Sequence, residues 1–322
     1  MHYGSHICNT MSTISKTMTF SAREHECEIL FCRKGPFYHL YTDGNSSEIL
    51  FSSKEDFIFM MNLIGVCSCH FKDVYIYAFA IMNNHLHFIL ECQRQQAEEF
   101  FEMIKGRLKR FYIRNSRYVN LKNFKCNFIQ VDNLNSLRNE IAYVNRNGYL
   151  VRPDCTPFSY PWGTGAWFFN PVCKLIPSCG FKSLSSKNKR GICHSHNIHF
   201  DSDNLTVYEG IILPSSFCCI AEAESMFRNA HHYFHMISKN FEAYSEIAHK
   251  LHEKVIFSDE EMYAVVSYIT YKQFNTKQPS LLAAKEKIEM AKRMHYEFNA
   301  SNRQIKNILK LDIGTIDELF PK

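Results

Sequence analysis

No two of the 13 cysteines in this 322-residue sequence form a CxxC pair, and they are scattered along the chain. That pattern argues against a disulfide framework and predicts free thiols in a reducing cytoplasm. No segment approaches 18 apolar residues, so we expect no membrane span and no membrane partner. The first residues also lack the apolar stretch of a secretory signal, and no internal repeat is visible. These absences together predict a cytoplasmic protein.

The composition predicts a folded core without identifying a ligand. Apolar residues make up 46% of the chain and aromatic residues 14%, which is incompatible with wholesale disorder. The formal net charge is only +5, so the chain is mildly basic. This charge permits nucleic acid as a partner, but only the local distribution of cations can argue for it.

The periodicity predicts an α+β fold over residues 35–170, with helices packed on a sheet. Residues 1–34 have no clear period and are expected to be a poorly ordered lead-in. Residues 171–203 are expected to be a linker, and residues 204–322 a mostly helical C-terminal region. We expect strands at 37–42, 49–51, 74–82, 85–91 and 128–131, and helices at 53–67, 97–118 and 135–147, the last stopped by Gly148.

Two histidines, His85 and His87, stand one residue apart in the run YAFAIMNNHLHFILE. Because strand side chains alternate between faces, both imidazoles should project from the same face of the sheet. Two imidazoles so placed can bind one metal ion, although a single His-x-His can also arise by chance. No third histidine lies near this motif.

A helix downstream would present a second pair of polar groups. Tyr143 and Asn147 are four residues apart, so they share one helix face, about 100° from the apolar stripe that faces the sheet. Tyr112, Tyr118 and Tyr149 have no amide one turn later. An edge tyrosine beside a capping asparagine is the structural alternative.

The segment between these motifs is basic and contains no acidic residue. Cations interleaved with aromatic rings suit single-stranded nucleic acid, because cations meet phosphates and rings stack on bases. A solvated helix face is the alternative. Residues 105–118 contain three aromatic residues and six cations, namely Lys105, Arg107, Lys109, Arg110, Arg114 and Arg117.

These motifs resemble the REP-associated tyrosine transposases and the related single-strand transposases of small insertion sequences. MNNHLHFILE is similar to the family's histidine–hydrophobe–histidine ("HUH") motif, and LKRFY, AYVNRNGYLV and FSYPWGTG follow in the expected order. The resemblance covers about residues 36–167, and more loosely residue 204 to the end. Asn83 and Gly148 stand where the family usually has proline.

The resemblance implies a ferredoxin-like α+β fold with an antiparallel sheet, and a single-strand DNA endonuclease and strand transferase. It implies that Tyr143 forms a covalent 5′-phosphotyrosine link, and that His85, His87 and Asn147 bind a divalent metal. This mixed nitrogen and oxygen set suits Mg²⁺ or Mn²⁺ better than structural zinc. The expected substrate is single-stranded or hairpin DNA, bound by the basic helix, and a homodimer is compatible with the pattern.

Two other functions remain open. One is a replication initiator or relaxase that uses the same histidines, and the other is a DNA-binding regulator that has lost cleavage. The C-terminal segment 285–320 is compatible with a helix-turn-helix, with Ser301 and Gln304 spaced as a capping box. Its acidic residues Asp317 and Glu318 would repel phosphate, so Arg303 and Lys306 are the expected DNA contacts there.

Overall fold

The computed structural model describes residues 21–44, 48–150, 159–239, 247–248, 250–251, 257 and 259–321. The chain divides into two compact units. The first comprises Met1–Tyr149 and Cys155–Ile237, and the second Leu150–Asp154 and Ser238–Lys322. The division near residue 238 therefore differs from the predicted boundary at 204.

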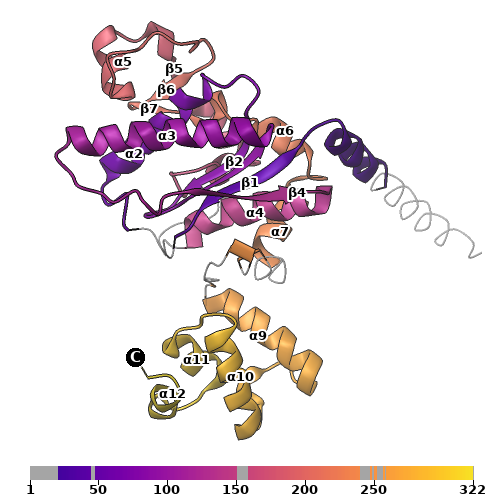
Figure 1. Ribbon diagram of the computed structural model, residues 1–322. Helices are drawn as coiled ribbons and strands as arrows, with labels where there is room; N and C mark the ends of the chain where they lie inside the picture. The colour runs from indigo at the N-terminus through magenta and orange to yellow at the C-terminus, as the bar shows by residue number, and fades with distance from the viewer. Residues whose placement is uncertain are drawn as a thin grey trace, which may run out of the picture. The chain divides into compact units, whose positions relative to one another are not determined.

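The first unit is built on a four-stranded antiparallel sheet with helices on both faces, as the predicted α+β class requires (Figure 1). The strand order is β2-β3-β1-β4, and each neighbouring pair is antiparallel. Helices α2 and α3 lie over one face and α4 over the other. The elements are β1 (Phe37–Thr42), α2 (Lys54–Ser68), β2 (Tyr75–Ile81), β3 (Leu86–Glu91), α3 (Arg94–Arg114), β4 (Cys126–Val131) and α4 (Leu134–Leu150).

Alternation along the strands supplies an apolar face for α2 and α3. Leu40 of β1 and Phe88 of β3 are paired in the ladder, and both belong to the main hydrophobic core. Met60 of α2 and Phe100 of α3 are fully buried in the same core. The opposite, odd-numbered positions of β1 and β3 therefore face α4.

Some secondary-structure elements differ from those predicted from the sequence. Residues 49–51 form no strand. The backbone N–H groups of Leu50 and Phe51 instead donate to the carbonyl of Asn83, at 2.9 and 2.8 Å, and so brace the β2–β3 turn. Helix α2 begins after Ser53, whose capping box with Asp56 satisfies two backbone donors.

Helix α4 runs through Gly148 to Leu150, so the predicted stop at that glycine is wrong. A Cβ at Gly148 would lie 2.3 Å from the ring of Tyr160, so the position requires glycine for packing rather than for a helix end. The Tyr160 hydroxyl donates to the carbonyl of Ile81 at 2.6 Å. The segment after α4 thus ties the helix to the sheet.

Residues 162–164 extend the sheet edge at β2. Gly163 bridges to Ala80 in an antiparallel pairing. The N–H of Ile81 donates to the carbonyl of Trp162 at 2.9 Å, and that of Thr164 to the carbonyl of Phe79 at 3.0 Å. This pairing satisfies backbone groups that an open edge would leave exposed.

Residues 171–203 are folded and belong to the first unit, so the predicted linker is wrong. A small core of Phe181, Ile192 and Ile212 packs with Val66 of α2. The region 204–237 also contains strands, which the helical expectation missed. The elements here are η1 (Gly165–Trp167), η2 (Pro171–Leu175), β5 (Cys179–Gly180), η3 (Phe181–Ser183), α5 (Ser186–Cys193), β6 (Thr206–Tyr208), β7 (Ile211–Ile212), η4 (Pro214–Ser216), α6 (Ile220–Ser225) and α7 (Ala230–Lys239).

Part of the predicted N-terminal lead-in is ordered. Residues 21–32 are helical, whereas residues 1–20 lie outside the described residues. The guanidinium of Arg138 on α4 donates to Glu24 at 2.6 and 3.2 Å and to the carbonyl of Met226 at 2.6 Å. Cys27 of the N-terminal helix is fully buried. This helix is therefore anchored to the first unit.

The second unit is helical. Its core includes Met290, Ile305, Leu309 and Ile316. The capping box predicted at Ser301 and Gln304 is present. No described helix of the chain is both long enough and apolar enough to cross a membrane. Its described elements are α9 (Asp259–Phe274), η5 (Pro279–Leu281), α10 (Ala284–Tyr296), α11 (Asn302–Leu309) and α12 (Ile313–Leu319).

We predict that Gly163→Ala destabilises the protein by about 1–3 kcal/mol, as overpacking does. An added Cβ would lie 2.5 Å from the backbone carbonyl oxygen of Phe79, which cannot move without breaking the edge pairing. Gly106→Ala is the control, because nothing lies within 4 Å of a Cβ there and the residue is inside α3. It should stabilise by up to about 1 kcal/mol. Denaturant unfolding of both variants measures the difference; equal effects would contradict it.

Candidate active site

Three elements bring polar side chains together on the α4 face of the sheet. In the β1–β3 ladder Tyr41 pairs with His87 and His39 with Ile89, so His39 and His87 project from the same face. Helix α4 lies over that face (Figure 1) and contributes Glu140, which contacts His39. The site therefore joins residues far apart in the sequence.

A buried hydrogen-bonded chain links these three residues. The Nδ1 of His39 lies 2.8 Å from Oε2 of Glu140, and its Nε2 lies 3.0 Å from Nδ1 of His87. Both histidines are 0% exposed and Glu140 is 5% exposed. Burial lowers the pKa of His87 well below its ordinary value of 6.5. His87 is therefore a neutral imidazole, the form that can donate an electron pair.

His85 directly precedes β3 and is only partly buried. The Nδ2 of Asn84 donates to the carbonyl of Gly44 at 2.6 Å, which leaves Oδ1 as the atom 2.7 Å from Nδ1 of His85. An amide oxygen only accepts, so His85 donates its proton through Nδ1. The lone pair of neutral His85 is thus on Nε2. A Cβ at Gly44 would lie 2.7 Å from the same Nδ1, so glycine there makes room for the ring.

Tyr143 lies among these rings. Its ring centroid is 5.9 Å from that of His87 and 6.1 Å from that of His39, and the His85 and His87 centroids are 4.9 Å apart. Three of the four predicted site residues are therefore neighbours. Asn147 is half-buried one turn further along α4. No hydrogen bond described for it joins it to the histidines.

The protein donors for a metal ion are few. Among the described residues, no group of three or more His, Cys, Asp and Glu side chains is arranged to hold a metal ion. The two imidazoles would need oxygen donors from an amide or from a ligand. Two imidazoles alone leave positions open around any ion they bind, whereas a structural zinc site is closed by four ligands.

Sequence reasoning missed His39 and Glu140. His39 lies in FYHLYT, a predicted strand, and the paired strand could not be identified from spacing alone. Glu140 is three residues before Tyr143, so the two share a face of α4. That i,i+3 spacing was the available signal.

The expectation that the basic helix offers rings for base stacking is wrong for two of its three aromatic residues. Phe111 is buried and stacks on Phe59 at a centroid distance of 3.7 Å. Tyr112 is also buried, and its hydroxyl donates to the carbonyl of Leu50 at 2.7 Å. Tyr118 is 95% exposed. Sequence spacing did not separate the core face of α3 from its solvent face.

Helix α3 lies on the opposite face of the sheet from α4, so most of α3 is separated from the histidines by the sheet (Figure 1). Its C-terminal end is closer to them. Tyr112 contacts Leu50, and Leu50 contacts Asn83 in the turn that carries His85. Arg114 and Arg117 follow Tyr112 along the chain, so these two predicted cations lie toward the histidine end of the sheet.

Three of the predicted DNA-binding cations make contacts within the protein. Arg107 lies 3.1 Å from Nε2 of His70, Arg114 donates to the carbonyl of His194 at 2.5 Å, and Arg117 pairs with the buried Asp56. The side chains of Lys109 and Arg110 are exposed, and that of Lys105 is partly buried.

A cationic cavity lies between the end of α3 and α5. It has a volume of about 310 Å³ and no carboxylate among its lining residues. Arg190 belongs to the segment that was predicted to be a linker, and the sequence therefore did not mark it as a site residue. Cationic and polar donors dominate the lining, which comprises Phe111, Arg114, Asn115, Arg190, His194, Ser195 and His196.

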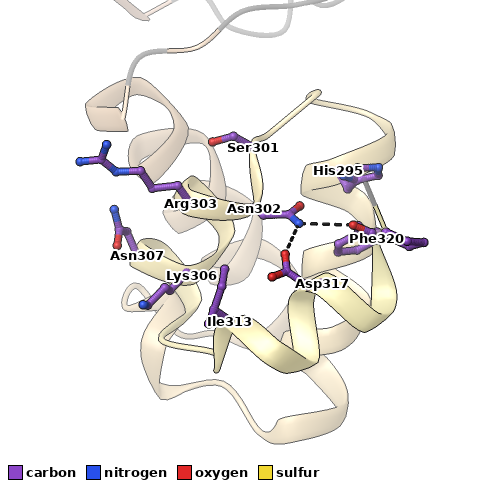
Figure 2. A pocket seen from close by; sticks show the side chains of 10 residues that line it. His295, Ser301, Asn302, Arg303, Lys306, Asn307, Ile313, Asp317 and Phe320 are labelled. Carbon is purple, nitrogen blue, oxygen red and sulfur yellow. Dashed lines mark hydrogen bonds between the residues drawn. The ribbon is translucent and has the colours of Figure 1, made fainter.

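The second unit carries a groove of about 710 Å³ beside α11, lined in part by Arg303, Lys306 and Asp317 (Figure 2). Asn302 donates to Oδ1 of Asp317 at 2.7 Å and to the carbonyl of Phe320 at 3.3 Å. The predicted cations Arg303 and Lys306 are exposed, as a phosphate contact requires. The groove also contains an acid, so it is not a purely cationic surface.

Comparison with known proteins gives one weak structural neighbour. No family model and no curated protein matches the sequence. A solved structure, "Structure of the REP associates tyrosine transposase bound to a REP hairpin", aligns with a TM-score of 0.31 and 17% identity. The alignment covers 41% of this chain and 77% of that chain.

The ion pair between Asp56 and Arg117 should make stability depend on acid pH. Burial alone would raise the pKa of Asp56, but hydrogen bonds from Arg117 and from the backbone of Ser52 and Ser53 lower it below 3.8. A lowered folded-state pKa stabilises fully above the unfolded value and is lost as pH falls through the folded value. We predict that Asp56→Asn loses less stability than wild type between about pH 5 and about pH 2.

Denaturant unfolding across that pH range measures the effect. Arg117→Ala should cost about 1–3 kcal/mol at neutral pH, because a buried carboxylate loses its partner. Arg110→Ala is the control, because the Arg110 side chain is exposed, and it should stay within about 0.5 kcal/mol of wild type. Parallel pH profiles for wild type and Asp56→Asn would contradict the assignment.

Proposed function

We propose that this protein is a metal-dependent single-strand DNA endonuclease and strand transferase, with Tyr143 as nucleophile. The observation that carries the proposal is the placement of the Tyr143 ring 5.9 Å from His87, which in turn is 4.9 Å from His85. A phenol beside two imidazoles can attack a phosphate that those imidazoles help to hold through a cation.

We further propose that the catalytic unit is ferredoxin-like and related to the REP-associated tyrosine transposases. The element order β1-α2-β2-β3-α3-β4 and the strand order β2-β3-β1-β4 support the fold. The order of the histidine motif, the tyrosine helix and the FSYPWGTG segment supports the family.

The donor chemistry fits a divalent cation such as Mn²⁺ or Mg²⁺. His85 offers the Nε2 lone pair, neutral His87 is a second nitrogen donor, and Asn147 could supply an amide oxygen from α4. When bound, such an ion neutralises negative charge on the scissile phosphate and polarises it for attack. The protein's part is to hold the two imidazoles and the phenol on one sheet face.

In the proposed reaction the Tyr143 oxygen forms a bond to phosphorus as the bond from phosphorus to the 3′ oxygen breaks. The phenol loses its proton and the departing 3′ oxygen gains one, so protons and electrons balance. The product is a 5′-phosphotyrosine and a free 3′ hydroxyl. Because one phosphodiester replaces another, a second 3′ hydroxyl can reverse the step without ATP.

The burial of Tyr143 and His87 favours, as the alternative function, a DNA-binding regulator that does not cleave. Tyr143 is 4% exposed and His87 0%, so a phosphodiester cannot reach them while α4 packs on the sheet as described. Cleavage therefore requires α4 to shift when DNA binds. A DNA-binding regulator that keeps the fold without cleavage needs no such shift, and it is the second candidate function.

The DNA path we propose runs past the histidine end of the sheet and the cavity lined by Arg114 and Arg190. Both arginines present guanidinium groups suited to backbone phosphates. Lys109 and Arg110 lie on the exposed face of the same helix. Arg303 and Lys306 are proposed as contacts of the second unit with DNA.

The nucleophile can be tested with a labelled hairpin oligonucleotide and Mn²⁺. We expect a denaturant-stable protein–DNA adduct with wild type and none with Tyr143→Phe, because the oxygen that forms the link is absent. Tyr118→Phe is the control, since Tyr118 is 95% exposed and removing its hydroxyl should leave the adduct unchanged. An adduct that persists in Tyr143→Phe refutes the assignment; tight binding with no adduct under any divalent ion favours the regulator.

The phosphate path can be tested by the salt dependence of hairpin binding. Arg114→Ala and Arg190→Ala should each weaken binding and reduce the slope of log K against log salt by about 0.7. Arg94→Ala is the control, because Arg94 pairs with Glu98 at the opposite end of α3. Unchanged slopes in both cavity variants would place the strand elsewhere.

A further inference from the structure

We propose that Glu140 and His39 are positioning residues that hold His87 in the tautomer with its proton on Nδ1 and its lone pair on Nε2. The inference rests on the proposed metal site and assigns a role to two residues outside that site. Neither residue needs to touch DNA or a cation. Their effect passes through the hydrogen bonds of the buried chain.

The tautomers follow from the order of the partners. The Glu140 carboxylate can only accept, so His39 donates to it through Nδ1, across 2.8 Å. In the proposed arrangement His39 is neutral, so its single N–H serves Glu140 and its Nε2 accepts. His87 must then donate through Nδ1 across the 3.0 Å contact, which leaves its lone pair on Nε2. An imidazolium at His39 would donate through both nitrogens and leave the lone pair of His87 on Nδ1 instead.

The same result arises at His85 by a separate route. There the carbonyl oxygen of Asn84 accepts from Nδ1, so the lone pair again lies on Nε2. Both histidines of the motif would therefore present the same nitrogen to a ligand. At both histidines the Nδ1 proton is held by an acceptor, which is an amide oxygen at one and a histidine–carboxylate pair at the other.

Burial makes the His87 arrangement hard to reverse. His39 and His87 are 0% exposed, so water cannot readily replace a lost hydrogen bond. Without the carboxylate, His39 could carry its proton on Nε2 and donate to His87. The proton of His87 would then move to Nε2, where it blocks metal binding. Substituting a residue that hydrogen-bonds to a metal-ligating histidine commonly weakens metal affinity by about 10–100-fold.

The first test needs no variant and no metal. Long-range ¹H–¹⁵N spectra of the full-length protein distinguish a protonated from an unprotonated imidazole nitrogen. With resonances assigned by His87→Gln and His39→Gln, we expect Nδ1 of His87 to be protonated and Nε2 to carry the lone pair. A proton on Nε2 of His87 in wild type overturns the inference.

The second test is titration of the protein with Mn²⁺ alone. Glu140→Gln should weaken Mn²⁺ binding at least about tenfold and shift the His87 spectrum toward the other tautomer. Glu91→Gln is the matched control. Glu91 is also buried and lies on the same strand as His87, but accepts from Tyr77 at 2.8 Å and from the Gly35 N–H at 3.0 Å. Its substitution should leave Mn²⁺ affinity unchanged.

The outcomes separate the inference from the function it rests on. If His85→Ala and His87→Ala leave Mn²⁺ binding unchanged, the proposed metal site fails. If those variants abolish binding but Glu140→Gln binds like wild type and keeps the tautomer, only the positioning role fails. Should Glu140→Gln not fold, His39→Phe removes the same link, and the wild-type spectrum still decides.

Discussion

The candidate site depends on one constraint: helix α4 covers a sheet face that carries ionisable side chains, so these side chains must find partners inside the protein. Helix α4 buries Glu140 against His39, and His39 against His87. A buried polar group without a hydrogen bond costs roughly 1–3 kcal/mol, and more when charged. These hydrogen bonds therefore couple the register of β1 on β3 to the position of α4, because none of the three side chains can move alone without losing a partner.

The same helix is held at its other end by a second polar cluster. Thr164 donates to Oδ1 of Asn145 at 2.7 Å, and Nδ2 of Asn145 donates to the Tyr233 hydroxyl at 3.0 Å. Gly148 packs against Tyr160 a few residues later. These contacts explain why the tyrosine helix is well fixed, and why access to Tyr143 requires them to rearrange.

The cationic surface illustrates how tertiary packing reassigns residues. The basic run of α3 looked like a nucleic-acid platform with stacking rings, yet Phe111 and Tyr112 belong to the core. Arg117 stabilises Asp56 at the start of α2, whereas Arg114 faces a cavity that α5 completes. Charge composition counts these arginines equally, but their neighbours give them different roles.

Much of the fold was predictable because it rests on local periodicity. The strands at 37–42 and 85–91, the helix that begins after Ser53 and the capping box at Ser301 follow from alternation and capping chemistry, and the structure confirms them within a few residues. The linker at 171–203 was wrong because its apolar residues pack against α2, far away in sequence.

The sequence by itself determined that His85 and His87 share a face and that Tyr143 and Asn147 share another, since both follow from the geometry of one element. Only the tertiary structure decided that the Tyr143 helix covers the histidine face, and that His39 and Glu140 lie behind His87. Those relations depend on strand pairing between residues about fifty positions apart, for which local periodicity carries no information.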